Sequence, residues 1–105
     1  MTEFINVFIT INDSRKAREI AESLLDKGLA ACVQISGPLT SLYKWEGKSV
    51  EDQEWLLIAK SDRDHYPELE KQVKKLHAYE VPEILAVAVE DGNRDYLNWL
   101  SKELK

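Results

Sequence analysis

The feature that most constrains the fold is a pair of long apolar segments, AACVQISGPLTSLYKW and VEDQEWLLIAKS, between residues 30 and 61. The four residues between them, EGKS at 46–49, form a glycine-containing connection of the length that hairpins favour, so the segments predict two antiparallel strands. The second strand is apolar on both faces, because Trp55 and Leu57 alternate with Leu56 and Ile58. We therefore expect another copy of the chain to supply a second covering layer.

Length and charge narrow the class of protein. A chain of 105 residues predicts a single domain over residues 1–105. The net charge of −5, with Lys and Arg scattered along the chain, argues against binding to nucleic acid. No apolar run approaches the roughly 18 residues that a membrane span needs, no signal-peptide pattern is present, and Cys32 is the single cysteine. We expect a cytoplasmic protein that does not bind membranes.

The segments around the hairpin alternate between strand and helix patterns. FINVFITI at 4–11 has the period of a strand, and a helical period over residues 17–25 ends at Gly28. A second helical stripe over residues 66–76 has Pro67 in its first turn, with candidate caps at Ser61, Asp62 and Asp64. Within the hairpin, a proline at position 38 predicts a bulge or a sheet edge.

The last third of the chain completes the pattern. EILAVAVE at 83–90 is apolar throughout and predicts a central strand covered on both faces, and DGN at 91–93 leads into a final helix. The resulting order, β-α-β-β-α-β with a C-terminal helix, predicts an α+β, ferredoxin-like fold. In this fold both main helices lie on one face of the sheet. The other face carries apolar residues here, so we expect a symmetric homo-oligomer with its sheets face to face.

The densest group of chemically active side chains is HAYEVPE at 77–83, with an imidazole, a phenol and two carboxylates. One interpretation is a metal site at His77 and Glu80; the alternative is that His77 caps a helix while Tyr79 packs. Cys32 is either a copper ligand or a small buried side chain. A nucleophilic pair of Cys32 and His77 lacks a glycine-rich oxyanion loop, so we do not expect an enzyme.

A second candidate site is a ligand cleft. The side chains of Tyr43, Trp45 and Tyr79 could line it, although aromatic residues at such spacing also belong to cores and interfaces. Lys60 ends an otherwise apolar strand, where it either extends its amine to water or neutralises an anion between subunits.

Five motifs in order along the chain carry a family resemblance: LAACVQI at 29–35, SLYKWEGK at 41–48, EWLLIAKS at 54–61, HAYEVPEI at 77–84 and DYLNWL at 95–100. Over nearly its whole length the chain resembles the CutA divalent-cation-tolerance proteins. The resemblance implies a ferredoxin-like subunit in a tight homotrimer, a cytoplasmic bacterial protein, and a genetic link to tolerance of copper and other divalent ions. It also implies an architecture similar to the trimeric PII signalling proteins, which bind small effectors between subunits.

The resemblance does not extend to every ligand of the family's copper sites, which use a cysteine at the end of the first strand and a histidine pair. Ile9 stands where that cysteine would fall, Leu76 precedes His77, and Ala78 replaces the family's usual proline.

We expect a non-enzymatic trimer in divalent-metal response, with no required cofactor, that binds copper or another divalent cation weakly through His77, together with Glu80 or Cys32. Two alternatives remain open. One is a PII-like sensor that binds a small anion in a cleft between subunits. The residues expected to line that cleft are Tyr43, Trp45, Lys60, His77, Tyr79 and Glu80. The other is a structural trimeric hub.

Overall fold

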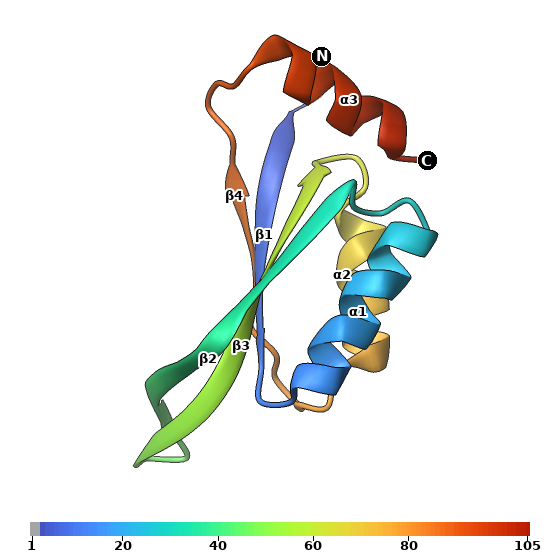
Figure 1. The fold of residues 1–105 in the computed structure, drawn as a ribbon. Helices are drawn as coiled ribbons and strands as arrows, with labels where there is room; N and C mark the ends of the chain where they lie inside the picture. The colour runs from blue at the N-terminus through green and yellow to red at the C-terminus, as the bar shows by residue number, and fades with distance from the viewer. Residues whose placement is uncertain (1–2) are drawn as a thin grey trace.

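Seven elements make up the computed structural model, which describes residues 3–105 (Figure 1). In chain order they are β1 (Phe4–Ile11), α1 (Ser14–Asp26), β2 (Cys32–Trp45), β3 (Lys48–Asp62), α2 (Tyr66–Leu76), β4 (Ile84–Ala88) and α3 (Arg94–Glu103). This order confirms the predicted α+β, ferredoxin-like arrangement with a C-terminal helix. No helix among the described residues is long and apolar enough to cross a membrane.

The four strands form one antiparallel sheet in the order β2-β3-β1-β4. Helices α1 and α2 lie side by side on one face of it, while α3 lies beyond one end (Figure 1). The alternation in β1 decides which face is covered, because every second side chain is buried beneath the helices. The fully buried core residues are Ile5, Val7, Ile9, Ile11, Ala17, Ile20, Leu24, Ala30, Leu57, Ala59, Leu69 and Val73.

The central hairpin is longer than the strands beside it. Strands β2 and β3 contain 14 and 15 residues, whereas β1 contains 8 and pairs only with residues 55–62 of β3. The outer half of the hairpin therefore pairs only with itself and extends away from the helices, as Figure 1 shows. Its turn places Glu46 at φ 50° and Gly47 at φ 78°. Two successive residues with positive φ give the type of turn that matches the twist of a hairpin.

The predicted irregularity at Pro38 is confirmed. The register between β2 and β3 shifts between Ser36 and Leu39, and β2 forms one edge of the sheet. A proline is tolerated there because an edge strand has no second neighbour that needs its missing N–H.

The prediction that EILAVAVE forms a central strand is wrong. Strand β4 is the other edge of the sheet, and Leu85 and Val87 are 56% and 48% exposed. A continuous apolar run indicates that both faces of a strand need cover, but it does not say whether the same chain supplies that cover. Here the helices of the chain cover one face only, and the other remains bare (Figure 1).

The face of the sheet opposite α1 and α2, which we call the open face, carries apolar side chains from three strands. The register places Phe8 between Ile58 on β3 and Leu85 on β4, in one row across the three strands. Leu56, one row further along β3, belongs to the same face. The prediction of an apolar open face is therefore confirmed.

A side chain caps the start of α1 but not that of α2. The Asp13 carboxylate caps α1 by accepting from the backbone N–H groups of Arg15 and Lys16. Before α2, β3 continues as far as Asp62, whose carboxylate accepts from the N–H of His65 at 2.9 Å. The N-cap residue of α2 is His65, and no side chain caps this helix, so the prediction that Ser61, Asp62 or Asp64 caps it is wrong.

Candidate functional site

A groove of about 640 Å³ lies where the outer half of the hairpin meets the end of β1 and the segment after α2. Its aromatic side chains are Tyr43, Trp45 and Tyr79, and its carboxylates are Asp52, Glu54, Glu80 and Glu83. Among the described residues that line it, none is Lys or Arg. The groove therefore combines apolar rings with a concentration of negative charge.

The best-defined contact in the groove joins Tyr79 to Glu54. The Tyr79 hydroxyl donates to the Glu54 carboxylate at 2.8 Å, and only 5% of Glu54 is exposed. Burial, followed by the hydrogen bond and negative charge of Glu54, raises the pKa of the Tyr79 phenol well above its usual range. This contact ties the segment after α2 to the middle of β3.

A weaker contact of the same kind lies nearer the turn of the hairpin. The Tyr43 hydroxyl donates to the Asp52 carboxylate at 3.5 Å, and both residues are on the hairpin itself. Desolvation and then the charges of Asp52 and Glu54 raise the pKa of Tyr43. The two phenols are thus held in their protonated form beside carboxylates.

Both ring nitrogens of His77 are already occupied. Nε2 lies 2.8 Å from the carbonyl oxygen of Thr10, so it donates, and Nδ1 accepts from the backbone N–H of Tyr79 at 3.0 Å. The His77 and Tyr79 rings meet edge to face with centroids 4.6 Å apart. A metal ion could bind His77 only after one of these hydrogen bonds broke, because coordination needs a free lone pair on nitrogen.

Cys32 begins β2, whereas His77 follows α2 and contacts Thr10 on β1. Cys32 faces Lys60 across the β2–β3 ladder, and Lys60 faces Asn6, four residues before Thr10 on β1. Four residues of strand correspond to about 13 Å. Nowhere in residues 3–105 do three His, Cys, Asp or Glu side chains converge as a preformed metal site.

The structure brings together four of the seven residues predicted from the sequence: Tyr43, Trp45, Tyr79 and Glu80 line the groove. Lys60 does not; it lies on the open face in the same row as Asn6 and Cys32. His77 stands behind the groove and orients Tyr79 through its backbone. Ile9, at the position of the family's copper-binding cysteine, is fully buried beneath the helices.

Sequence reasoning missed Asp52 and Glu54, and it did not select Glu83, the second carboxylate of the HAYEVPE cluster, as a site residue. The signal for Asp52 and Glu54 was present in EDQE at 51–54, because residues two apart on a strand share a face. Their proximity to Tyr79 follows only from the pairing of β1 with both β3 and β4.

Comparison with known proteins agrees with this architecture. The family model described as CutA1 divalent ion tolerance protein matches residues 5–103. A divalent-cation tolerance protein CutA from Thermus thermophilus is 50% identical over 94 residues, which cover 90% of this chain and 91% of that protein.

Solved structures give the same result. The Cut A1 divalent cation tolerance protein of Thermus thermophilus superposes with a TM-score of 0.93 at 47% identity, covering all of both chains. CutA1 from Oryza sativa gives a TM-score of 0.95 at 37% identity, covering 98% of this chain and 94% of that one. A CutA structure from Archaeoglobus fulgidus, described as periplasmic, gives 0.91 at 36% identity over the full length of both chains.

The fold and the groove define a ferredoxin-like α+β protein with an extended central hairpin and a bare sheet face. Within that class, the family match and the identities show that the chain belongs to the CutA1 divalent ion tolerance protein family.

Proposed function

We propose that this chain is a divalent-cation tolerance protein that acts in the cytoplasm as a homotrimer, without catalysing a reaction, and that binds divalent cations weakly in the groove. The observation that carries the proposal is the charge of the groove: four carboxylates line it and no Lys or Arg does, among the residues described. Such a cleft attracts cations and repels anions.

The ligands available favour weak, exchangeable binding. Glu80 and Glu83 offer oxygen atoms on one short segment, opposite Asp52 on the hairpin. Carboxylate oxygens suit hard divalent ions, while a tight copper site would draw on imidazole or thiolate. Here His77 must give up a hydrogen bond before it can coordinate copper, and Cys32 lies at the far end of the ladder. We propose Glu80 as the principal ligand and His77 as a secondary one.

Two kinds of surface that have no partner within the single chain support the trimer: exposed apolar side chains and the edges of the sheet. The open face exposes Leu85 and Val87, and the outer hairpin carries exposed Leu42 and Trp45. Contiguous apolar surfaces of this kind usually mark interfaces. The edge strands β2 and β4 also have backbone groups without a neighbouring strand, which a second copy could pair.

Native mass spectrometry tests subunit number and cation binding together, first on the purified protein and then with copper(II) or manganese(II) at one equivalent per chain. We expect a trimer that takes up either ion weakly, and Glu80→Gln should reduce uptake. Glu90→Gln, an exposed residue outside the groove, is the matched control. A monomer at micromolar concentration would contradict the trimer, and unchanged uptake in Glu80→Gln would contradict the site.

A second candidate function is that of a sensor for a small organic ligand, which the three aromatic rings of the groove favour. An anionic effector would need a cation from elsewhere, and Lys60 on the open face could supply it only in a cleft formed with another copy. An organic mass retained by the native trimer and lost in Lys60→Ala would support the sensor. If the trimer binds neither an ion nor an effector, the structural trimeric hub is the remaining function.

A further inference from the structure

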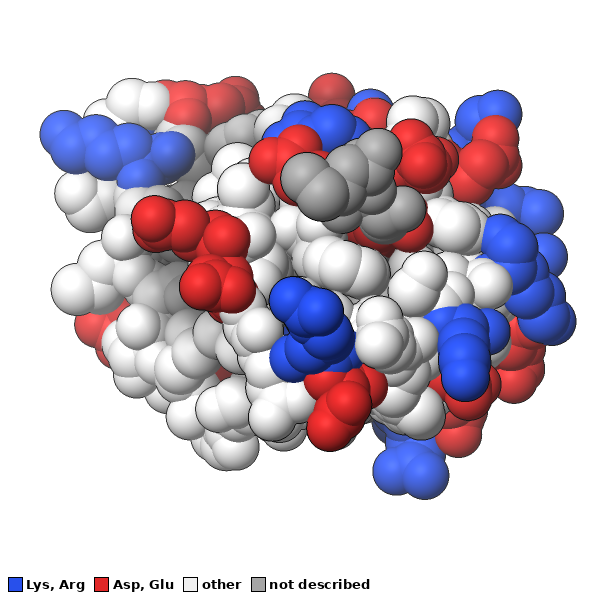
Figure 2. All heavy atoms as spheres, turned by 90° about the horizontal axis from the view of Figure 1, so that it is seen from above, with Lys and Arg blue, Asp and Glu red and all other residues white. Residues whose placement is uncertain are grey.

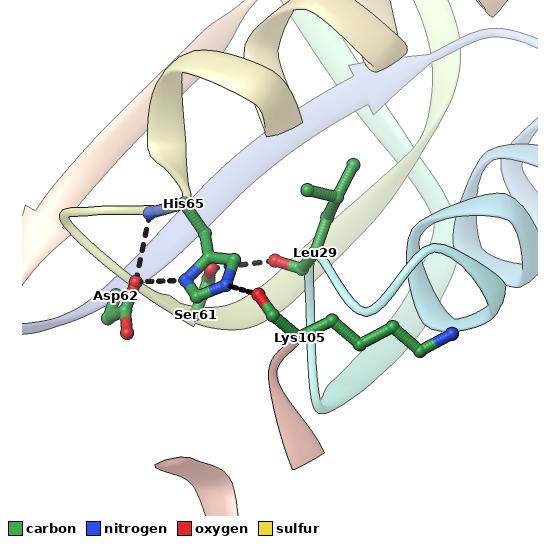
Figure 3. Close-up of polar contacts among 5 residues, drawn as sticks. All are labelled: Leu29, Ser61, Asp62, His65 and Lys105. Atoms are coloured by element: carbon green, nitrogen blue, oxygen red, sulfur yellow. Dashed lines mark hydrogen bonds and ion pairs between the residues drawn. The ribbon is translucent and has the colours of Figure 1, made fainter. Parts of the chain in front are cut away.

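At the end of the sheet remote from the groove, Lys105 joins the ends of two helices (Figure 3). Its backbone N–H donates to the carbonyl of Gly28, just after α1, at 3.0 Å, and its Nζ donates to the carbonyl of Asp26 at 3.0 Å. Its own carbonyl oxygen faces Nε2 of His65, at the start of α2. We call Gly28, Asp62, His65 and Lys105 the clasp.

The clasp depends on the absence of a side chain at Gly28. A Cβ atom at that position would lie 2.3–2.6 Å from three side-chain carbons of Lys105, and Gly28 has a φ of +66°. Lys105 therefore packs directly on the backbone that ends α1. A lysine amine at that end is also favoured by the negative end of the helix dipole.

His65 lies between two groups that only accept hydrogen bonds. Its Nδ1 is 2.6 Å from the Asp62 carboxylate, and its Nε2 contacts the Lys105 carbonyl oxygen. Both ring nitrogens must carry a proton to make both bonds, so the geometry requires the imidazolium form. The Asp62 side chain is only 7% exposed and that of His65 is 21% exposed, so solvent screens the pair little.

We propose that the clasp is a pH-operated latch, in which protonated His65 holds Lys105, and the chain that follows α3, against the ends of α1 and α2. When His65 loses its proton, one of the two bonds must break. The Asp62 carboxylate is held beside the ring because it also accepts from the backbone N–H of His65 at 2.9 Å, so the contact with the Lys105 oxygen is the one released. The two remaining contacts of Lys105 then hold the segment less firmly.

The acidic side chains around the His65 ring also favour its protonated form. Asp62 and Asp64 flank it on the β3–α2 connection, and Glu68 lies in the first turn of α2. Among the cationic groups, Arg63 pairs with Glu3, and the Lys105 amine donates to the backbone carbonyl of Asp26. Partial burial lowers the pKa of His65, but the bonds to Lys105 and Asp62 and the charges of Asp62 and Asp64 outweigh it and raise that pKa above 6.5.

The sign of the pH dependence follows. Because the pKa of His65 is higher in the folded chain than its ordinary 6.5, the clasp contributes its full stability below pH 6.5. That contribution is lost as the pH rises through the raised pKa of the folded state.

A pH titration of the full chain by NMR tests the latch, following the His65 ring together with the backbone amides of Lys105 and Gly28. We expect all three to change with one midpoint above pH 6.5. The hydrogen-exchange protection of the Lys105 amide should fall roughly two- to tenfold across that midpoint, as expected for the loss of one hydrogen bond. A His65 midpoint at or below 6.5, or a Lys105 amide that does not follow it, would overturn the proposal.

Two pairs of variants sharpen the test. His65→Asn should abolish the pH step of the Lys105 amide; a step that persists would exclude His65 as its cause. Asp62→Asn should lower the His65 midpoint more than Asp64→Asn, since Asp62 bonds the ring and Asp64 contributes only its charge. Equal shifts would show that general charge, and not the clasp geometry, holds the proton. The wild-type titration decides the proposal even where a variant fails to fold.

Discussion

The hydrogen bond between Tyr79 and Glu54 is the contact on which the groove most depends. Glu54 is a nearly buried carboxylate on a strand, and the Tyr79 hydroxyl is the donor that the structure provides for it. Removing that donor would leave a buried acceptor poorly solvated, which costs more free energy than the bond itself contributes.

We therefore expect Tyr79→Phe to lower the free energy of unfolding by about 1–3 kcal/mol, because the Glu54 carboxylate loses its partner. Urea denaturation followed by tryptophan fluorescence measures the change. Tyr43→Phe is the matched control: it removes the same atom from the longer, exposed contact with Asp52 and should have a much smaller effect. Equal losses in the two variants would show that burial of Glu54 is unimportant.

The tyrosines also predict how stability responds to alkaline pH. Burial and then the neighbouring Glu70 raise the pKa of Tyr66 to about 12, and Tyr79 is raised further. Phenols whose pKa is higher in the folded chain than the ordinary 10.0 contribute their full stability below pH 10, and lose it as the pH rises through their folded values. Denaturant midpoints should be level as the pH approaches 10 and fall above it. Denaturant midpoints that stay level above pH 10 would contradict this expectation.

At the scale of elements, the hairpin β2–β3 organises the chain. Its inner half joins the rest of the sheet through β3, which pairs with β1, and its outer half carries one wall of the groove. The turn that joins the two strands adopts positive φ at both positions, although only the second is a glycine. Glu46 therefore occupies a conformation that side chains other than Asn, Asp and Gly adopt at a cost.

Glu46→Asn should stabilise the chain by roughly 0.4–1 kcal/mol, because Asn-Gly is the preferred pair for this turn. Gly47→Ala should destabilise the chain by about 1–2 kcal/mol, because alanine disfavours the positive φ at this position. Steric contact adds nothing, since a Cβ there meets no atom within 4 Å. Thermal unfolding of both variants tests the pair. If Glu46→Asn is destabilising, the turn does not have the geometry described.

The elements differ in how well the sequence predicts them. The alternation in residues 4–11 identifies the buried face of β1, because helices of the same chain cover it. The apolar run in β4 misled the prediction of its place, since the helices of the chain leave its second face uncovered. The groove was predicted in part: its aromatic residues stand in recognisable strand positions, but the contact of Tyr79 with Glu54 joins residues 25 apart through the tertiary fold.

At the scale of the whole molecule, polar and apolar surfaces are separated. The view from above in Figure 2 shows acidic and basic side chains interspersed without a continuous basic area. The open face instead presents the apolar rows of β1, β3 and β4.

Val87→Lys should therefore convert the proposed trimer to monomers, because it places a charge in the apolar open face without disturbing the core. Leu25→Lys is the matched control, since Leu25 on α1 is 44% exposed and Val87 is 48% exposed. Light scattering after size-exclusion chromatography gives both masses. Monomers of the unmodified chain, or trimers of Val87→Lys, would argue against packing through this face.

The outer half of the hairpin pairs only with itself, so its length can change without a change in the rest of the sheet. Because β1 pairs with β3 only at residues 55–62, residues 39–53 play no part in setting the register of the core strands. Removing or adding residues in opposed pairs near the turn would change how far the hairpin reaches, while every core side chain kept its face. Evolution or design can thus change how far the outer half of the hairpin extends toward a neighbouring molecule, at little cost to the stability of the fold.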